Sequence, residues 1–178
     1  MSSDEEQPAS TDPLASLLGA ALDMERREVE LLPELISETV DPVLRKGLDH
    51  HLEETREHVT NVEEMFRVVG LRPAAVPDPV LEGLEAEHRR LLRARTGDQR
   101  MLTVVATTVA VEHAEIARYD VLRALAEARG CSRAVELIVR TLGQERQALK
   151  LVCESMHRLF GHSGIEPELV ESGHGSAG

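Results

Sequence analysis

The 178-residue chain has almost no aromatic side chains: it contains no tryptophan, one tyrosine and two phenylalanines. Its core must therefore be aliphatic. It has only two cysteines, Cys131 and Cys153, which are too few for a disulfide framework, so we expect reduced thiols. What remains is rich in alanine, leucine, glutamate and arginine, a composition typical of helical proteins.

Signals for secretion and for membrane insertion are also missing. The first residues, MSSDEEQPASTDP, contain neither the basic nor the apolar segment of a signal peptide. No apolar run approaches the roughly 18 residues needed to cross a bilayer. The net charge of −12 argues against a nucleic-acid partner and favours cations. We therefore expect a cytoplasmic protein with no nucleic-acid and no membrane partner.

Aspartate–proline pairs mark the starts of three helices, at Asp12, Asp41 and Asp78. Each aspartate can cap a helix whose first residue is the following proline, and Ser132 is a candidate fourth cap. The pattern predicts helices over residues 13–39, 42–69, 79–95, 98–129 and 132–160. Residues 1–12 are expected to be a disordered acidic segment, 13–160 the helical domain and 161–178 a flexible tail.

Four long helices and one short helix predict an all-α bundle. The first two long helices and the last two have short connections, so each pair should be antiparallel. The connection over residues 70–97 is long and contains the short helix. It is long enough to cross over along the bundle. An up-down-up-down bundle with the short helix at one end is the alternative, and we favour the crossover.

The stretch TVVATTVAVEHAEIARYDVL carries Glu112 and Glu115 within an apolar helix. At about 100° of rotation per residue, both carboxylates fall inside the apolar stripe, one on each side of its midline. On the first helix Glu25 lies in the middle of the apolar face, with Glu28 one turn away. On the last helix Glu145 is central. These glutamates are therefore expected to point inward.

The second long helix gives a less regular pattern. His51 and His58 lie in the inward half of this helix, whereas Glu54 lies toward the edge, about 100° from the centre. Each of the four long helices thus offers a carboxylate or an imidazole to the interior of the bundle.

Buried carboxylates must be protonated, paired with a cationic side chain, or bound to a metal. The arginines and lysines on these faces point sideways or outward, with the exception of Arg123. That residue lies about three turns from Glu112 and cannot serve every carboxylate. Two iron or manganese ions could, because carboxylate oxygens with a minority of imidazoles suit these metals.

Bundles that hold two such ions use Glu-x-x-His pairs on two helices. Literal matches occur at Glu85–His88 and Glu154–His157. We expect neither to form the site, because the first is on the short helix and Glu154 is on the solvent face of the last one.

Three segments resemble a known family: HLEETREHVTNVEEMFRVVG, VEHAEIARYDVLRALAEARG and TLGQER. They are similar to the YciE/YciF family of bacterial ferritin-like proteins, over about residues 17–152. The resemblance implies a ferritin-like four-helix bundle with an extra helix, a homodimer, a di-metal centre and a link to stress responses. The activity of that family is poorly defined, so the resemblance informs fold and site more than function.

The resemblance also implies site residues, which are Glu25, His51, Glu54, Glu112, His113, Glu115, Tyr119 and Glu145. This chain departs from the family pattern at two positions. His58 stands where the family has glutamine, which could add a ligand. Ala114 stands where the family often has tyrosine.

Combining these observations, we predict six metal ligands: Glu25, Glu54, His58, Glu112, Glu115 and Glu145. Three weaker candidates are His51, which could orient a ligand, Tyr119, which could hydrogen-bond a carboxylate, and Glu28. His113 is expected at a flank or an interface.

Three functions are compatible with this prediction. The first is a di-iron or di-manganese oxidoreductase that reacts with oxygen or peroxide. The second is a metal-binding or storage protein without turnover. The third is a metal-free helical interaction module of the stress response. The first is our interpretation of the sequence.

Overall fold

The computed structural model describes residues 12–161, and this part of the chain is helical with no strand. The five helices are α1 (Pro13–Glu38), α2 (Pro42–Val68), α3 (Pro79–Ala94), α4 (Asp98–Ala128) and α5 (Ser132–Phe160). Every boundary lies within one residue of the prediction. The predicted disordered start and flexible tail fall almost entirely on residues 1–11 and 162–178, outside the described range.

Three helices begin at the predicted aspartate caps. The side chains of Asp12, Asp41 and Asp78 each accept a hydrogen bond from a backbone amide two or three residues later, at 2.7 to 3.0 Å. These bonds satisfy amides that have no partner within the helix. The prediction for Ser132 was wrong. Cys131 occupies the cap position of α5, and no side chain of residues 12–161 caps that helix end.

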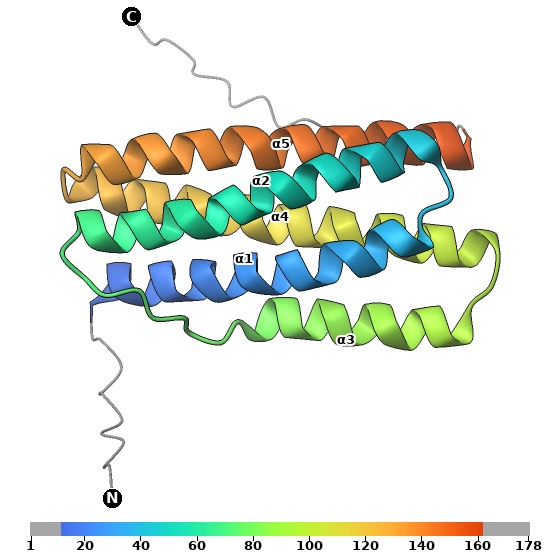
Figure 1. The fold of residues 1–178 in the computed structure, drawn as a ribbon, viewed down its shortest axis with the longest axis horizontal. Helices are drawn as coiled ribbons and strands as arrows, with labels where there is room; N and C mark the ends of the chain where they lie inside the picture. The colour runs from blue at the N-terminus through green and yellow to red at the C-terminus, as the bar shows by residue number, and fades with distance from the viewer. Residues whose placement is uncertain (1–11, 162–178) are drawn as a thin grey trace, which may run out of the picture.

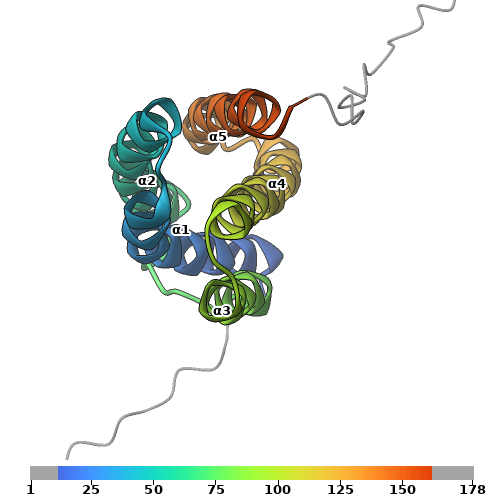
Figure 2. The same ribbon diagram turned by 90° about the vertical axis from the view of Figure 1, so that its right-hand side faces the viewer.

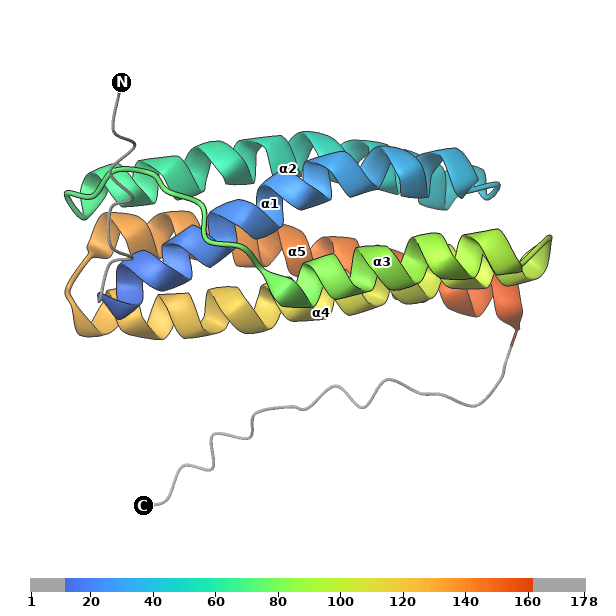
Figure 3. The same cartoon turned by 90° about the horizontal axis from the view of Figure 1, so that it is seen from below.

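The four long helices form a ring in the order α1, α2, α5, α4, as the end-on view in Figure 2 shows. All neighbours in the ring are antiparallel, and α2 and α4 run in the same direction (Figure 1) on opposite corners (Figure 2). The chain must therefore return along the bundle between α2 and α4. Helix α3 lies in this return, outside the ring against α4 and α1 (Figure 3). The ferritin-like bundle with a crossover is confirmed.

The core is aliphatic, as the composition predicted. Leucines from all four long helices are buried, and the largest fully buried side chains include only two aromatic residues, Tyr119 and Phe66. Among the described residues, no helix combines the length and the apolar character that a membrane span requires. Both cysteines are free and half-buried.

Asp78 fixes the crossover to the bundle. Its backbone amide donates to Asp23 Oδ2 of α1 at 2.8 Å, and its carboxylate both caps α3 and pairs with Arg118 of α4. The side chain of Asp78 is 2 % exposed and that of Arg118 is 18 % exposed, so the pair is shielded from solvent. One residue thus joins α1, α3 and α4.

We expect Asp78→Ala to lower the free energy of unfolding by about 3 kcal/mol, because it removes a helix cap and leaves Arg118 without its partner. Urea denaturation followed by circular dichroism measures the change. The exposed Asp49 on α2 supplies the control, since Asp49→Ala should change the stability by no more than about 0.5 kcal/mol. Equal effects of the two substitutions would contradict this account of the crossover.

Candidate metal centre

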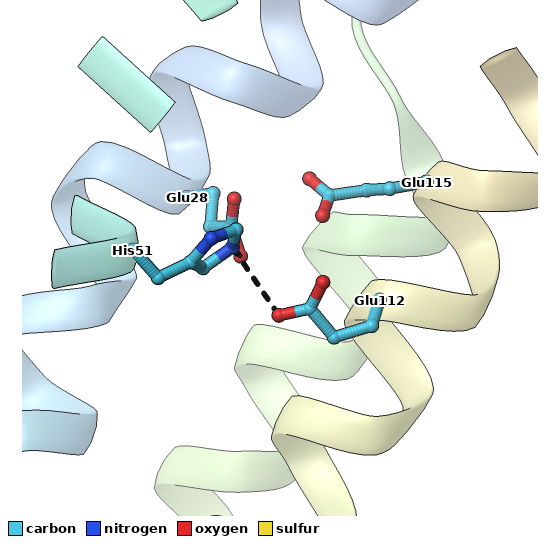
Figure 4. Close-up of side chains that lie close together, drawn as sticks. All are labelled: Glu28, His51, Glu112 and Glu115. Carbon is cyan, nitrogen blue, oxygen red and sulfur yellow. Dashed lines mark ion pairs between the residues drawn. The ribbon is translucent and has the colours of Figure 1, made fainter. Parts of the chain in front are cut away.

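Seven buried side chains from the four long helices meet inside the bundle in two groups. Glu28, His51, Glu112 and Glu115 form the first group, in which each residue offers one ligand atom within 4.8 Å of the others (Figure 4). Glu25, His58 and Glu145 form the second group by the same measure. All seven residues are at most 2 % exposed.

Helical spacing explains why these side chains converge. Glu25 and Glu28 on α1 are three residues apart, as are Glu112 and Glu115 on the neighbouring α4, so each pair occupies one face of its helix. His51 and His58 are seven residues apart on α2, which corresponds to about two turns on the same face. The two groups therefore lie one above the other along the bundle axis.

In the first group, His51 is the central contact. Its Nε2 lies 3.2 Å from Glu112 Oε1 and 3.4 Å from Glu28 Oε1. The contact with Glu112 crosses the bundle from α2 to α4 (Figure 4). Glu115 lies beside Glu112, and neither of its oxygens has a hydrogen bond within the described structure.

Glu145 connects the two groups. One of its oxygens, Oε1, lies 2.9 Å from His58 Nδ1, and the other, Oε2, lies 3.5 Å from His51 Nε2. His58 Nδ1 is also 3.4 Å from Glu25 Oε2. A carboxylate with one oxygen turned to each group is suitably placed to bridge two cations.

The site contains more acceptor atoms than donors. Among the described residues, both carboxylate oxygens of Glu112, Glu115 and Glu145 are buried without a hydrogen bond, as is one oxygen of Glu25. Native proteins rarely leave buried polar atoms unpaired, because each costs about 1–3 kcal/mol or more. The residues present therefore fit cations with a preference for oxygen ligands.

Arg123 does not neutralise this centre, and the expectation that it points inward was wrong. Its side chain is 42 % exposed and pairs with Glu127 on the same helix at 3.0 Å. The nearer Arg118 is engaged by Asp78. The positive charge inside the site therefore has to come from its histidines, from protons or from bound ions.

Burial raises the pKa of the central carboxyls. The pKa of Glu112 is raised to about 6 and that of Glu145 to about 8, although His51 and His58 oppose the shifts. Burial and the surrounding carboxylates raise the pKa of Glu115 well above its ordinary value. These groups hold protons more tightly than exposed carboxyls do.

The histidines shift in the same direction for a different reason. Burial alone would lower the pKa of His58, but the charges of Glu25 and Glu145 raise it to about 11. Glu112 and Glu28 likewise raise the pKa of His51 well above its ordinary value. Burial would raise the pKa of Glu28, but His51 outweighs it and lowers that pKa. Without bound ions, the centre is balanced by protonated histidines and protonated carboxyls.

Tyr119 is fully buried beside the second group, and its hydroxyl donates a hydrogen bond to Glu25 Oε1. The sole tyrosine thus holds the carboxylate of Glu25, which is the role considered for Tyr119 from the sequence. Burial and the charge of Glu25 raise the pKa of Tyr119 well above its ordinary value, so the hydroxyl keeps its proton and remains a donor.

Of the nine residues named from the sequence, seven form the two groups, and Tyr119 and Glu54 lie outside them. The side chain of Glu54 is 14 % exposed, and it contacts His51, His50 and Gln144. Glu28 and His51, named as weaker candidates, lie in the first group. The spacing of Glu25 and Glu28, which repeats that of Glu112 and Glu115, was a signal that could have placed Glu28 higher.

The literal Glu-x-x-His matches lie elsewhere, as expected. Glu154 is 61 % exposed beside Lys150. Glu85 and His88 lie on the buried face of α3 itself. Glu85 faces arginines, and His88 Nδ1 lies 2.9 Å from Thr107 Oγ1. His113 is exposed. None of these residues belongs to the two groups.

A cavity lies at the far end of the bundle, lined by Ser37, Arg100, Met101 and Phe160 among others. None of the seven clustered residues lines it. It is therefore separate from the chemistry of the site.

Comparison with known proteins identifies the family. The family described as "Domain of unknown function (DUF892)" matches residues 10–161, and the chain belongs to it. Protein YciF of Escherichia coli (strain K12) is 27 % identical over 137 residues, which cover 76 % of this chain and 82 % of YciF. The family resemblance inferred from the three sequence segments is confirmed.

Two solved structures are similar along most of their length. YcfI from Rhodopseudomonas palustris has a TM-score of 0.78 at 29 % identity, covering 83 % of this chain and 96 % of YcfI. The crystal structure of the E. coli stress protein YciF also has a TM-score of 0.78, at 24 % identity, covering 83 % of this chain and 94 % of YciF. Both likenesses support the helical fold.

The pKa shifts predict how the stability of the metal-free protein depends on pH. Because the pKa of His58 is higher in the folded protein, protonation of His58 favours the folded state. This contribution to the free energy of unfolding is complete below about pH 6.5 and is lost as the pH rises toward 11. The folded protein also favours the protonated forms of Glu112 and Glu145. Their contributions to stability are lost as the pH rises through about 6 for Glu112 and about 8 for Glu145. Glu28 acts in the opposite sense. Its pKa is lowered in the folded protein, so it stabilises the fold at pH values above its ordinary pKa of 4.5, and this contribution is lost as the pH falls.

We therefore expect the melting temperature of chelator-treated protein to be higher at pH 6 than at pH 9, by at least about 5 °C. Scanning calorimetry in matched ionic strength measures this difference. A Glu145→Gln variant should show a smaller slope, since it removes one of the titrating groups. A melting temperature that rises between these pH values would contradict the electrostatic description of the centre.

Proposed function

We propose that this member of the DUF892 family binds two iron or manganese ions inside its bundle and reacts with oxygen or hydrogen peroxide. The observation that carries this proposal is the convergence of five buried carboxylates and two imidazoles, with most of the carboxylate oxygens unpaired. The first group would hold one ion and the second group the other, and Glu145 is within reach of both.

The chemistry of the ligand set supports the choice of metal. Carboxylates outnumber imidazoles, and neither Cys131 nor Cys153 belongs to the groups. Such a set suits iron or manganese better than softer metals. Two divalent ions would bring four positive charges against five carboxylates, so the site would become close to neutral without protonated histidines.

Bound ions of this kind would supply one electron each, which matches the two electrons and two protons that convert hydrogen peroxide into two water molecules. The chain itself would contribute position and shielding. Its carboxylates and imidazoles lose protons when they bind ions, and Tyr119 holds Glu25 in place through its hydroxyl. The aliphatic core around the site excludes bulk water.

A non-catalytic metal-binding role is the second candidate. All seven residues are at most 2 % exposed, and such deep burial also suits ions that serve structure or storage. The related YcfI is described as a candidate structural protein. Both candidates require bound metal, whereas a metal-free interaction module does not. Homodimerisation stays a prediction.

The first experiment measures metal content by plasma mass spectrometry on untagged protein purified without chelator. We expect about two iron or manganese ions per chain, the number that carboxylate bundles of this type hold. The Glu112→Gln/Glu145→Gln double variant should lose both ions, because it removes ligands from each group. Glu127→Gln/Glu154→Gln is the matched control on the same two helices, since both residues are exposed. Wild-type protein without metal, before and after reconstitution, would refute the proposal.

A second experiment separates turnover from storage. Anaerobic protein loaded with Fe(II) is mixed with hydrogen peroxide, and oxidation is followed by the near-ultraviolet absorbance of Fe(III). We expect oxidation at least about 100-fold faster than for the double variant, whose loss of ligands removes the bound metal. Equal rates for the wild type and the double variant would favour the non-catalytic role.

A further inference from the structure

The two histidines of the site turn their outer ring nitrogens to the same pair of side chains, Gln144 and Glu54. Gln144 lies on α5, next to Glu145 in the chain, and Glu54 lies on α2 between the histidines. Both are half-buried in the seam between α2 and α5. Neither belongs to the two groups of candidate ligands.

The contact between His58 and Gln144 determines which nitrogen of His58 faces the centre. His58 Nε2 lies 3.1 Å from Gln144 Oε1, and the amide nitrogen of Gln144 donates to Glu54 Oε1 at 3.2 Å. Because a carboxylate accepts this bond, the amide turns its nitrogen to Glu54 and its oxygen to His58. An amide oxygen only accepts, so His58 carries a proton on Nε2, and Nδ1 is the nitrogen available to an ion.

Glu54 extends the same chain of contacts to the other histidine. Its second oxygen, Oε2, lies 3.6 Å from His51 Nδ1, an ion-pair contact longer than a hydrogen bond, while His51 Nε2 faces Glu112 and Glu28. The outer nitrogens of His58 and His51 are thus connected through Gln144 and Glu54, on a path that does not pass through the centre. Such outer partners fix the ring orientation and the tautomer of metal-binding histidines.

We infer that Gln144 and Glu54 form one positioning pair that orients both histidines and thereby couples the two ligand groups. This inference rests on the proposed function, because the oriented nitrogens matter only if they bind ions. Glu54 then acts on the site through His51 rather than as a ligand.

The test uses Zn²⁺ as a diamagnetic probe, titrated into metal-free protein by calorimetry. Gln144→Met keeps the size of the side chain and removes the acceptor. We expect this substitution to lower the affinity for the zinc ion in the group of His58 by about 10- to 100-fold. Gln144→Glu keeps an acceptor for His58 but removes the donor to Glu54, so it should recover the affinity of the ion in the group of His58 without restoring the link to Glu54. Gln147→Met, on the exposed side of the same helix, is the matched control and should match the wild type.

Nitrogen-15 NMR of the zinc-loaded protein gives a readout that a purely structural role would not move. We expect the ring proton of His58 on Nε2 in the wild type and in Gln144→Glu, and a mixture of ring states in Gln144→Met. Circular dichroism confirms that each variant is folded. If Gln144→Met does not fold, the wild-type tautomer and the Gln144→Glu variant still decide the question.

The outcomes separate the inference from the function on which it rests. Wild-type protein that binds no zinc, iron or manganese would overturn both. Two other outcomes would overturn the inference but leave the proposed function standing. One is that Gln144→Met and Gln147→Met each bind two zinc ions with equal affinities, and the other is that His58 carries its proton on Nδ1. Glu54→Gln decides the role of Glu54: two ions bound more weakly support the positioning pair, whereas the loss of one whole ion would make Glu54 a ligand and overturn it.

Discussion

The cost of removing carboxylates from water governs the interior of this bundle. Five glutamates and two histidines lie in a core made mostly of aliphatic side chains, and among the described residues no arginine or lysine pairs with these glutamates. Their charges must therefore be balanced among themselves, by protons or by ions. The raised pKa values of Glu112, Glu145 and His58 are direct consequences of this constraint.

The rest of the fold holds these groups against one another. The antiparallel ring places two glutamates of α1 beside two glutamates of the neighbouring α4, and two histidines of α2 beside the single glutamate of α5. The crossover permits this order, because it lets α2 and α4 run in the same direction (Figure 1) at opposite corners (Figure 2). Asp78 and Arg118 fix the crossover to α4 close to the level of Glu115. The chain topology thus determines which side chains meet at the site.

Most of the fold could be predicted from the sequence, because aspartate–proline caps and helical periodicity act locally. Periodicity also placed Glu25, Glu112, Glu115 and Glu145 in the interior. Periodicity alone placed Glu54 toward the edge of its helix face and Glu28 one turn from Glu25 on the apolar face; Glu54 was ranked higher because the family resemblance included it and did not include Glu28. Arg123 was misjudged because a long side chain on an inward position can still reach solvent and pair with Glu127. The contact between His58 and Gln144 joins residues distant in the chain, and no local pattern predicts it.

The hydrogen bond from Tyr119 to Glu25 has an optical consequence. The chain contains no tryptophan and no other tyrosine, so nearly all of its near-ultraviolet absorption and intrinsic emission comes from the one phenol that touches the candidate centre. The spectroscopic signal that reports on a whole structure in most proteins reports here on a single carboxylate. The protein therefore carries its own reporter group for whatever occupies its interior.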